Sequence, residues 1–428
     1  MDYSLTIQGG NDGWACYVKS NNDIFEPRTV TDGYTDGNVA AYHIFQAQKL
    51  SPLLLALGGR VLPAVHDNTL NITVIFDPTT SLPRYIRSYE DNHVFGPSTS
   101  DLQVYNYTQV EGVMFPRNIK ELYNRDSGSV LQDFFIYDIE VNPTIDPSFF
   151  DGLSRNQTQS TPSAPIIEFD YGFAEIGEWD SNMLWGGKYK GKSSNVSATH
   201  PIPTVPQLWH ITFLDSTGYT QIVMEFEDAV IVGEAPVHQS QQVIQWVRDT
   251  LGKNITHIWS THHHHDHSYG TRDYIAAGAK AIVIDTAVDY WSNIPGIEFI
   301  TYSASEPYIH RDANIEARFL GVFDKHHAED MSYAFISAPC PGPSDTVAIF
   351  EADLWNPGFT DYRFDQEQAL VLLDQAAKDG VSRNAVVIPV HGVEAPLEGL
   401  IDATDYNYPN YTAVDFKAGG KLCTGGQY

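Results

Sequence analysis

The chain has 428 residues, of which 42% are hydrophobic, and its 54 acidic and 25 basic side chains give it a formal net charge of −29. This hydrophobic content supports folded cores rather than disorder, and the length favours two domains over one. The negative surface would repel phosphate backbones, and no apolar run approaches the roughly 18–20 residues that a bilayer requires, so we expect neither a nucleic-acid partner nor a membrane span.

Residues 1–150 have the pattern of a mostly antiparallel β domain. The segment 39–50 is compatible with a helix. Runs rich in β-branched and aromatic residues, separated by turn residues at hairpin spacing, predict strands at 70–77, 82–89, 104–113 and 133–141. These residues contain no recognisable group of catalytic or metal-binding side chains, so the sequence indicates no role for this domain.

The polar, proline-containing segment 151–165 is typical of a linker, and we expect a second domain at 166–428. Strands and helices alternate there from about residue 208, which is typical of a layered α/β fold with its functional side chains at the strand ends. Two long segments, 186–197 and 302–314, are expected to be loops that influence the choice of substrate. The predicted helices lie at 243–251, 269–277 and 366–378.

The segment THHHHDH at 261–267 contains five of the 16 histidines of the chain. On an extended chain His262 and His264 point to the same side, and a following helix would begin with Asp266 and His267. The intervening histidines, His263 and His265, would then face elsewhere, and we expect them not to bind metal. A solvated histidine run would instead bind metal loosely and would predict no ligands elsewhere in the chain.

This segment resembles the T-H-x-H-x-D-H signature of the metallo-β-lactamase-fold hydrolases through Thr261, His262, His264, Asp266 and His267. The resemblance covers roughly the last half of the chain. It implies an α/β fold, a four-layer αββα metallo-β-lactamase-like sandwich, preceded here by the mostly antiparallel β domain. It also implies three further metal ligands downstream.

The third histidine of the family is expected at the start of a strand, with an aspartate a few residues later. The H-x-x-x-D spacing between His326 and Asp330 favours His326 for this role, and His327 stays as the alternative. The family's early acidic residue corresponds less clearly to Glu234, which follows a predicted strand and stands where an aspartate is common.

Two further segments match the family in order along the chain. Asp353 follows the predicted strand 347–350 and corresponds to the bridging acid, although Ala352 stands where the family usually has glycine. His391 ends the predicted strand 385–390 and precedes a glycine, as the last histidine of the family does.

The resemblance divides the ligands between two metal ions. Imidazole and carboxylate donors favour two divalent ions, with Zn²⁺ first and Fe or Mn as alternatives. Two cations lower the pKa of a shared water toward neutrality, and Asp266 is expected to act as the catalytic residue that orients this water. The first ion is assigned to His262, His264 and His326, the second to Asp266, His267 and His391, and Asp353 bridges them.

We therefore expect a hydrolase that cleaves an ester or lactone bond of a small neutral or cationic molecule. Phosphodiester, thioester and β-lactam hydrolysis are alternatives on the same fold, and the acidic surface disfavours the first of these. Flavodiiron-type oxygen reductases have an acidic residue where His264 stands, which disfavours redox chemistry. The non-enzymatic alternative is a metal-binding scaffold whose N-terminal domain binds a polymer or partner. The oligomeric state stays open.

Six N-glycosylation sequons favour a secreted, extracellular glycoprotein over a cytoplasmic protein, although the first residues lack the features of a signal peptide. Cys16 and Cys423 could link the two ends of such a chain, or be isolated thiols. The sequons lie at Asn71, Asn106, Asn156, Asn195, Asn254 and Asn410.

Overall fold

The computed structural model divides the chain into two compact units, Met1–Lys188 and Tyr189–Tyr428. The expected linker at 151–165 and the cysteine at 423 lie outside the described residues. Within the described residues, no helix combines the length and apolar character needed to cross a membrane. The structure describes residues 4–10, 13–19, 33–35, 37–51, 63–94, 96–124, 130–144, 146, 171–185, 189, 191–323, 327–341, 345–358, 366–382 and 384–404.

The division between the units falls later than the boundary expected at 166. Helix α3 (Phe173–Trp185) contributes Ile176 and Trp179 to the hydrophobic core of the N-terminal unit. The apolar face of α3 therefore belongs with the first unit.

The N-terminal unit is built on an antiparallel six-stranded sheet whose strands follow chain order, β4 to β9. In β5, Ile72, Val74 and Phe76 are buried while the residues between them are half-buried, as expected for a sheet with one covered face. Helix α1 (Gly37–Lys49) and α3 pack against each other and share the core of this covered face. The strands are β4 (Ala64–Asp67), β5 (Ile72–Phe76), β6 (Pro83–Asn92), β7 (Gly96–Val110), β8 (Val113–Tyr123) and β9 (Val130–Phe135), and a separate three-stranded sheet holds β1 (Ser4–Gly10), β2 (Gly13–Lys19) and β3 (Gly33–Thr35).

The strand expected at 104–113 is in fact the junction of two strands. β7 ends at Val110 and β8 begins at Val113, and Glu111 and Gly112 between them have φ angles of 51° and 87°. Positive φ at both central residues is the geometry of the tightest hairpin turn, which usually carries asparagine or aspartate before glycine. Glutamate at that position gave no turn signal in the sequence.

Part of the covered face of this sheet is polar although it is buried. Lys49 Nζ, from α1, donates to Ser100 Oγ on β7 at 3.0 Å, and Ser100 donates to Glu121 Oε1 on β8 at 3.0 Å. All three side chains are buried. This chain of hydrogen bonds therefore connects the lysine to the carboxyl group of Glu121.

Two more carboxyl groups lie in the same buried region. The Asn92 side-chain amide donates to Glu90 Oε1 at 2.9 Å and to Asp180 Oδ2, on α3, at 3.4 Å. Burial raises the pKa of Glu90, and burial with the nearby charges of Glu90 and Glu121 raises the pKa of Asp180 well above its usual range. The folded unit therefore holds protons that an unfolded chain would release.

We expect the docking of α3 on the sheet to weaken as pH rises. The unfolded carboxyl groups lose their protons at a pH of about 4, whereas the folded ones keep them, so the stability is greatest below that pH and declines as pH rises toward the raised pKa values. Amide hydrogen exchange of residues 173–185 should therefore be slowest, after correction for its intrinsic pH dependence, at or below about pH 4 and should become faster as pH rises, and Asp180→Asn should reduce this dependence. Glu175→Gln, an exposed change on the same helix, should not; an equal effect of both variants would contradict the interpretation.

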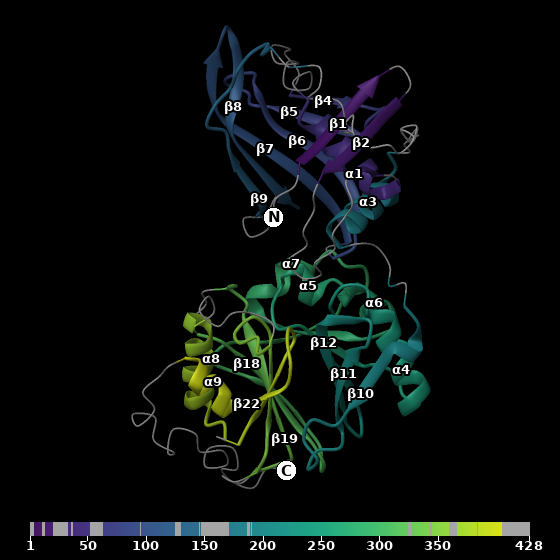
Figure 1. Cartoon of the computed structure of the whole chain (residues 1–428), viewed down its shortest axis with the longest axis vertical. Helices are drawn as coiled ribbons and strands as arrows, with labels where there is room; N and C mark the ends of the chain where they lie inside the picture. Colours follow the sequence, from purple (N-terminus) through teal and green to yellow (C-terminus); the bar gives the residue numbers. More distant parts are fainter. Residues whose placement is uncertain are drawn as a thin grey trace. The chain divides into compact units, whose positions relative to one another are not determined.

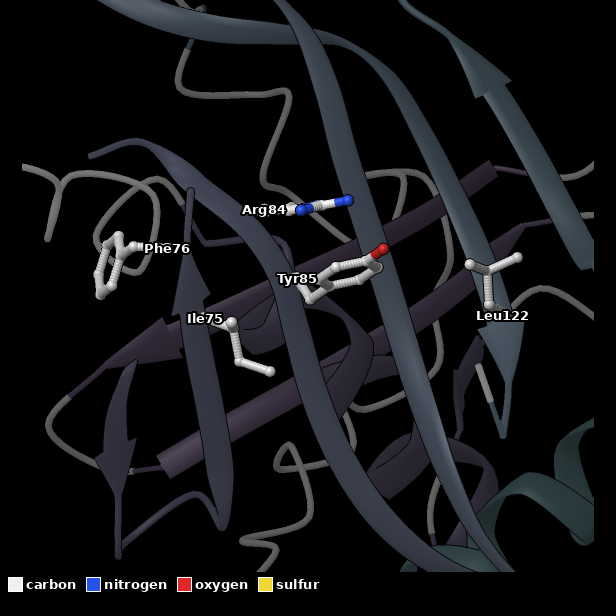
Figure 2. A pocket seen from close by; sticks show the side chains of 5 residues that line it. All are labelled: Ile75, Phe76, Arg84, Tyr85 and Leu122. Atoms are coloured by element: carbon white, nitrogen blue, oxygen red, sulfur yellow. The ribbon is translucent and has the colours of Figure 1, made fainter. Parts of the chain in front are cut away.

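A half-open depression of about 290 Å³ lies in the N-terminal unit. Figure 2 shows the five described side chains that line it, from β5, β6 and β8. Four are apolar or aromatic and one is a guanidinium, so this described lining offers no acid–base or nucleophile pair for catalysis. The lining residues are Ile75, Phe76, Arg84, Tyr85 and Leu122.

The C-terminal unit contains two sheets that face each other. Trp259 on the first sheet packs against Phe319 and Phe350 on the second, with ring centroids 5.1 and 6.2 Å apart. Helices α4 (Ser240–Leu251) and α6 (Thr271–Ala276) pack on the outer side of the first sheet, and α8 (Gln366–Asp379) and α9 (Leu397–Ala403) share a core with the second. Figure 1 shows this order of layers, which confirms the four-layer αββα sandwich.

The first sheet has seven strands and the second has six. The first, in spatial order, is β10 (Val196–Thr199), β11 (Leu208–Phe213), β12 (Ser216–Glu225), β13 (Val230–Gly233), β14 (His257–Trp259), β15 (Lys280–Ile284) and β16 (Phe299–Tyr302). The second is β17 (Tyr308–Arg311), β18 (Glu316–Gly321), β19 (Ser332–Ser337), β20 (Ala348–Glu351), β21 (Val386–Pro389) and β22 (Ala395–Pro396). The helices are α4 (Ser240–Leu251), α5 (His265–Ser268), α6 (Thr271–Ala276), α7 (Val288–Trp291), α8 (Gln366–Asp379) and α9 (Leu397–Ala403).

Two strands lie where loops were expected. β10 falls at the end of the expected loop 186–197, and β17 falls within 302–314. Both have four residues and both are edge strands, so they need no buried apolar alternation that a sequence could show.

The parallel parts of the two sheets direct their carboxyl ends to one edge. β13 and β14 are parallel neighbours in the first sheet, and β20 and β21 are parallel neighbours in the second. The loops that follow these four strands carry Glu234, the histidine segment, Asp353 and His391. Ligands and catalytic groups of open α/β sheets commonly lie at this edge.

Candidate metal centre

The histidine segment forms a tight strand-to-helix connection between β14 and α5. Ser268 Oγ donates to the carbonyl oxygens of His263 and His264, at 2.9 Å each. Ser260 Oγ donates to the carbonyl oxygen of His267 at 3.0 Å. Two serine hydroxyls thus fix the backbone that carries the imidazoles.

Three imidazoles and one carboxylate form a first cluster, with ligand atoms all within 4.8 Å of one another: His262, His264, His327 and Asp353. The Nε2 atom of His327 lies 3.0 Å from Nδ1 of His264 and 3.4 Å from Oδ2 of Asp353. Two nitrogens bound to one tetrahedral Zn²⁺ at about 2.0–2.1 Å lie roughly 3.3 Å apart, which is close to these separations. The first cluster therefore has the size of a metal site.

Asp266, His267 and His391 form a second cluster on the same scale. Asp266 Oδ2 lies 3.4 Å from Nε2 of His267 and 3.5 Å from Nε2 of His391. Both clusters are next to Asp353, whose Oδ2 lies 3.5 Å from His262 Nε2 and 2.8 Å from His267 Nε2, and whose Oδ1 lies 3.6 Å from His391 Nε2. One carboxylate thus joins both clusters.

The third histidine of the first cluster is His327 in the structure, which was the alternative in the sequence analysis. His326, which the spacing to Asp330 favoured, lies outside the described residues. Asp330 Oδ1 accepts a hydrogen bond from His263 Nδ1 at 2.7 Å, so this aspartate is a partner of His263. The choice between His326 and His327 therefore stays a prediction, and His327 is the candidate among the described residues.

The two intervening histidines of the segment belong to neither cluster. His263 stacks on Tyr290 with ring centroids 3.9 Å apart and an interplanar angle of 8°. Its Nδ1 donates to Asp330 Oδ1. His265 begins α5 and is half-buried.

Each buried ligand imidazole is oriented through its second nitrogen. His391 Nδ1 donates to the carbonyl oxygen of Gly218 at 2.7 Å, which directs Nε2 to the second cluster. His267 Nδ1 lies 2.8 Å from Glu234 Oε2. The Nε2 atom of His262 is buried and makes no hydrogen bond. A buried lone pair without a donor, next to a carboxylate, fits a bound cation.

Glu234 and Glu351 shape the two loops that meet at the centre. Glu234 is fully buried, and its Oε1 accepts the backbone N–H of Thr261 at 2.6 Å while its Oε2 accepts from His267. Glu351 Oε2 accepts two backbone N–H groups just beyond Asp353, at 3.1 and 3.2 Å, and so closes the turn in which Asp353 has a φ of 58°. A carboxylate that orients a ligand histidine is a common feature of metal sites.

The charges at the centre favour a cation. Burial lowers the pKa of His262 well below its usual range and that of His264 to about 4, so both rings are neutral. Burial also opposes protonation of His267, but the carboxylates of Asp266, Asp353 and Glu234 outweigh it and raise its pKa well above the usual value. A divalent cation would supply the positive charge that these carboxylates otherwise draw to His267.

No protein-family model matches the chain, and no curated protein matches it. Among solved structures, it is similar to a metallo-β-lactamase from Hirschia baltica, at 16% identity and a TM-score of 0.35, over 49% of this chain and 96% of that one. The metallo-β-lactamase FIM-1 from Pseudomonas aeruginosa, in its mono-zinc form, gives 17% identity and a TM-score of 0.36, over 50% and 96%. A flavo di-iron protein mutant from Thermotoga maritima gives 11% and 0.37, over 49% and 60%.

Metal counting should separate the two clusters from the histidine run. His262→Ala combined with His391→Ala removes one ligand from each cluster and should release metal from both. His263→Ala combined with His265→Ala removes two imidazoles outside the clusters and should leave the metal content unchanged. Elemental analysis after dialysis measures both, and equal losses in the two double variants would contradict the assignment.

Proposed function

We propose that the chain is a metal-dependent hydrolase with a two-ion centre. The observation that carries the proposal is the position of Asp353, whose two carboxylate oxygens lie within 3.6 Å of imidazole nitrogens from both clusters. The first ion would be held by His262, His264 and His327, the second by Asp266, His267 and His391, and Asp353 would contact both. The imidazole and carboxylate donors favour Zn²⁺, with Fe or Mn as alternatives.

Two bound divalent ions would supply Lewis acidity and a water acidified toward neutral pH. The protein contributes the orientation of the reactants. The charges of His267 and His391 outweigh the effect of burial and lower the pKa of Asp266 to about 2, so Asp266 is ionised at neutral pH and can accept a hydrogen bond from that water. Asp266 is the catalytic residue in this proposal.

The substrate class proposed is a small neutral or cationic molecule with an ester or lactone bond. The net charge of −29 supports this class, because it would repel polyanionic and strongly anionic substrates. Phosphodiesters, thioesters and β-lactams are the other candidate substrates of such a centre.

A substrate panel tests this proposal. Purified protein with a measured metal content would be incubated with esters, lactones, β-lactams, thioesters and phosphodiesters. Ester or lactone turnover that chelation abolishes and metal restores is the expected result. Turnover of phosphodiesters alone would overturn the substrate class, and a fully metallated protein that hydrolyses nothing would favour the scaffold alternative.

We also propose that the protein is a secreted glycoprotein, on the support of its six sequons. The described sequon asparagines differ in access: Asn106 and Asn254 are exposed, whereas the Asn71 side chain donates to the carbonyl oxygen of Tyr171 at 3.1 Å. Deglycosylation of protein from its natural source should lower its mass, with the change at Asn106 or Asn254. An unmodified mature protein would contradict this.

A further inference from the structure

The loop that carries His391 belongs to the second sheet but is tied to the first. Thr220 on β12 of the first sheet donates its N–H to the carbonyl oxygen of Val390 at 2.8 Å, and its Oγ1 donates to that of Pro389 at 2.7 Å. Gly218, two residues earlier, accepts from His391 Nδ1. The first sheet therefore sets the position of a ligand that the second sheet supplies.

A second tie lies just beyond the ligand. His210 on β11 has its Nδ1 2.5 Å from Oε1 of Glu394, three residues after His391. His210 is only 6% exposed, and its hydrogen bond lowers the pKa of Glu394 below the usual value. The pair therefore joins a buried imidazole of the first sheet to an ionised carboxylate on the His391 loop.

The pair joins a buried residue of the first sheet to an exposed residue beside the second. On β11 the neighbouring side chain, Trp209, faces helix α4, where its ring lies 5.3 Å from that of Trp246. Because side chains alternate along a strand, His210 points to the opposite side, toward the second sheet. Glu394 meets it there, immediately before β22.

The chain between His391 and Glu394 has little freedom. Gly392 has a φ of 117°, and a Cβ there would lie 2.4 Å from the carbonyl oxygen of Pro357. Val393 donates its N–H to that same oxygen at 2.9 Å. Because Gly392 and Val393 leave the three-residue connection little room to adjust, we infer that losing the contact at Glu394 would shift the backbone that carries His391.

We propose that the His210–Glu394 pair is a positioning pair for the second metal site, which it sets by fixing the loop of His391. The inference rests on the proposed two-ion centre. A pair with a purely structural role would change the stability of the unit without separating the affinities of the two sites. A positioning pair weakens the second site selectively, because the first-cluster ligands come from other loops.

Stepwise Co²⁺ titration, followed by visible absorption, tests the pair. His391→Ala protein would mark the signal of the first cluster alone. Glu394→Ala should raise the dissociation constant of the second site by about 10-fold, the lower end of what losing a direct hydrogen-bond partner of a metal ligand costs, and leave the first unchanged. Glu394→Gln, which keeps a hydrogen-bond acceptor, should lose less and keeps the test available if the alanine variant fails to fold.

Two controls make the outcome specific. Glu398→Ala removes an exposed carboxylate from the neighbouring helix α9 and should change neither site. His210→Ala/Glu394→Ala should lose no more than either single variant, because the two residues act as one unit. If wild type binds two ions and Glu394→Ala binds both as tightly, or weakens both equally, the inference is overturned while the proposed function stands. If wild type binds fewer than two ions, both are overturned.

Discussion

Replacing Asp353 with alanine should release both metal ions and reduce hydrolysis by more than about 100-fold. Losing a residue that only hydrogen-bonds a metal ligand costs at most about 100-fold, and Asp353 is proposed to contact both ions itself. Asp353 lies next to both clusters, 2.8 Å from His267 Nε2 and 3.5 Å from His262 Nε2. Its removal also leaves the buried imidazoles without a bridging charge. Elemental analysis and turnover of the preferred ester or lactone measure the two effects.

The matched control is Asp289→Ala, which removes an exposed carboxylate from the short helix α7. It should retain both ions and full turnover. An Asp353→Ala protein that kept its metal and its activity would refute the bridging role, even if every other ligand assignment held.

Replacing Glu234 with alanine should have the largest effect on stability. The change leaves the backbone N–H of Thr261 and Nδ1 of His267 without their buried acceptor, and breaking such a buried pair costs about 3–5 kcal/mol. We also expect about a 10–100-fold loss of metal affinity, since His267 would lose the carboxylate that orients it. Denaturant unfolding of the metal-free protein and metal titration measure these two quantities separately.

Glu316→Ala is the matched control, because it also removes a buried, hydrogen-bonded carboxylate but one that lies away from the two clusters. Glu316 is buried and accepts from Arg318 Nε at 2.6 Å, at the start of β18 rather than at the edge that holds the clusters. It should destabilise the unit by a similar mechanism while leaving metal affinity unchanged. Equal affinity losses in the two variants would mean that Glu234 acts through general stability only.

The sequence predicted the part of the centre that is local in the chain. His262, His264, Asp266 and His267 lie within six residues, and a strand followed by a helix is enough to bring three of their imidazoles and one carboxylate to one edge. Asp353 and His391 could be found because each follows a buried strand. These assignments remain predictions until metal is measured, but the structure places all of these side chains in the two clusters.

The sequence could not predict the contacts that orient the ligands. The carbonyl oxygen of Gly218 accepts from His391 over a separation of 173 residues, and any residue type would supply that oxygen. His210 and Glu394 are 184 residues apart and meet only because two sheets pack face to face. The position of α3 could not be predicted for the same reason. The pattern of an amphipathic helix shows that it has an apolar face, but not which of two units buries that face.

The measurement that tests the central claim most directly is the metal content of the wild-type protein, purified without added metal and dialysed against metal-free buffer, then reconstituted and dialysed again. Two tightly bound divalent ions per chain after reconstitution are the predicted result, with loss of both in His262→Ala/His391→Ala and of neither in His263→Ala/His265→Ala. Less than one ion per chain, or binding that depends on His263 and His265, would contradict the two-ion centre.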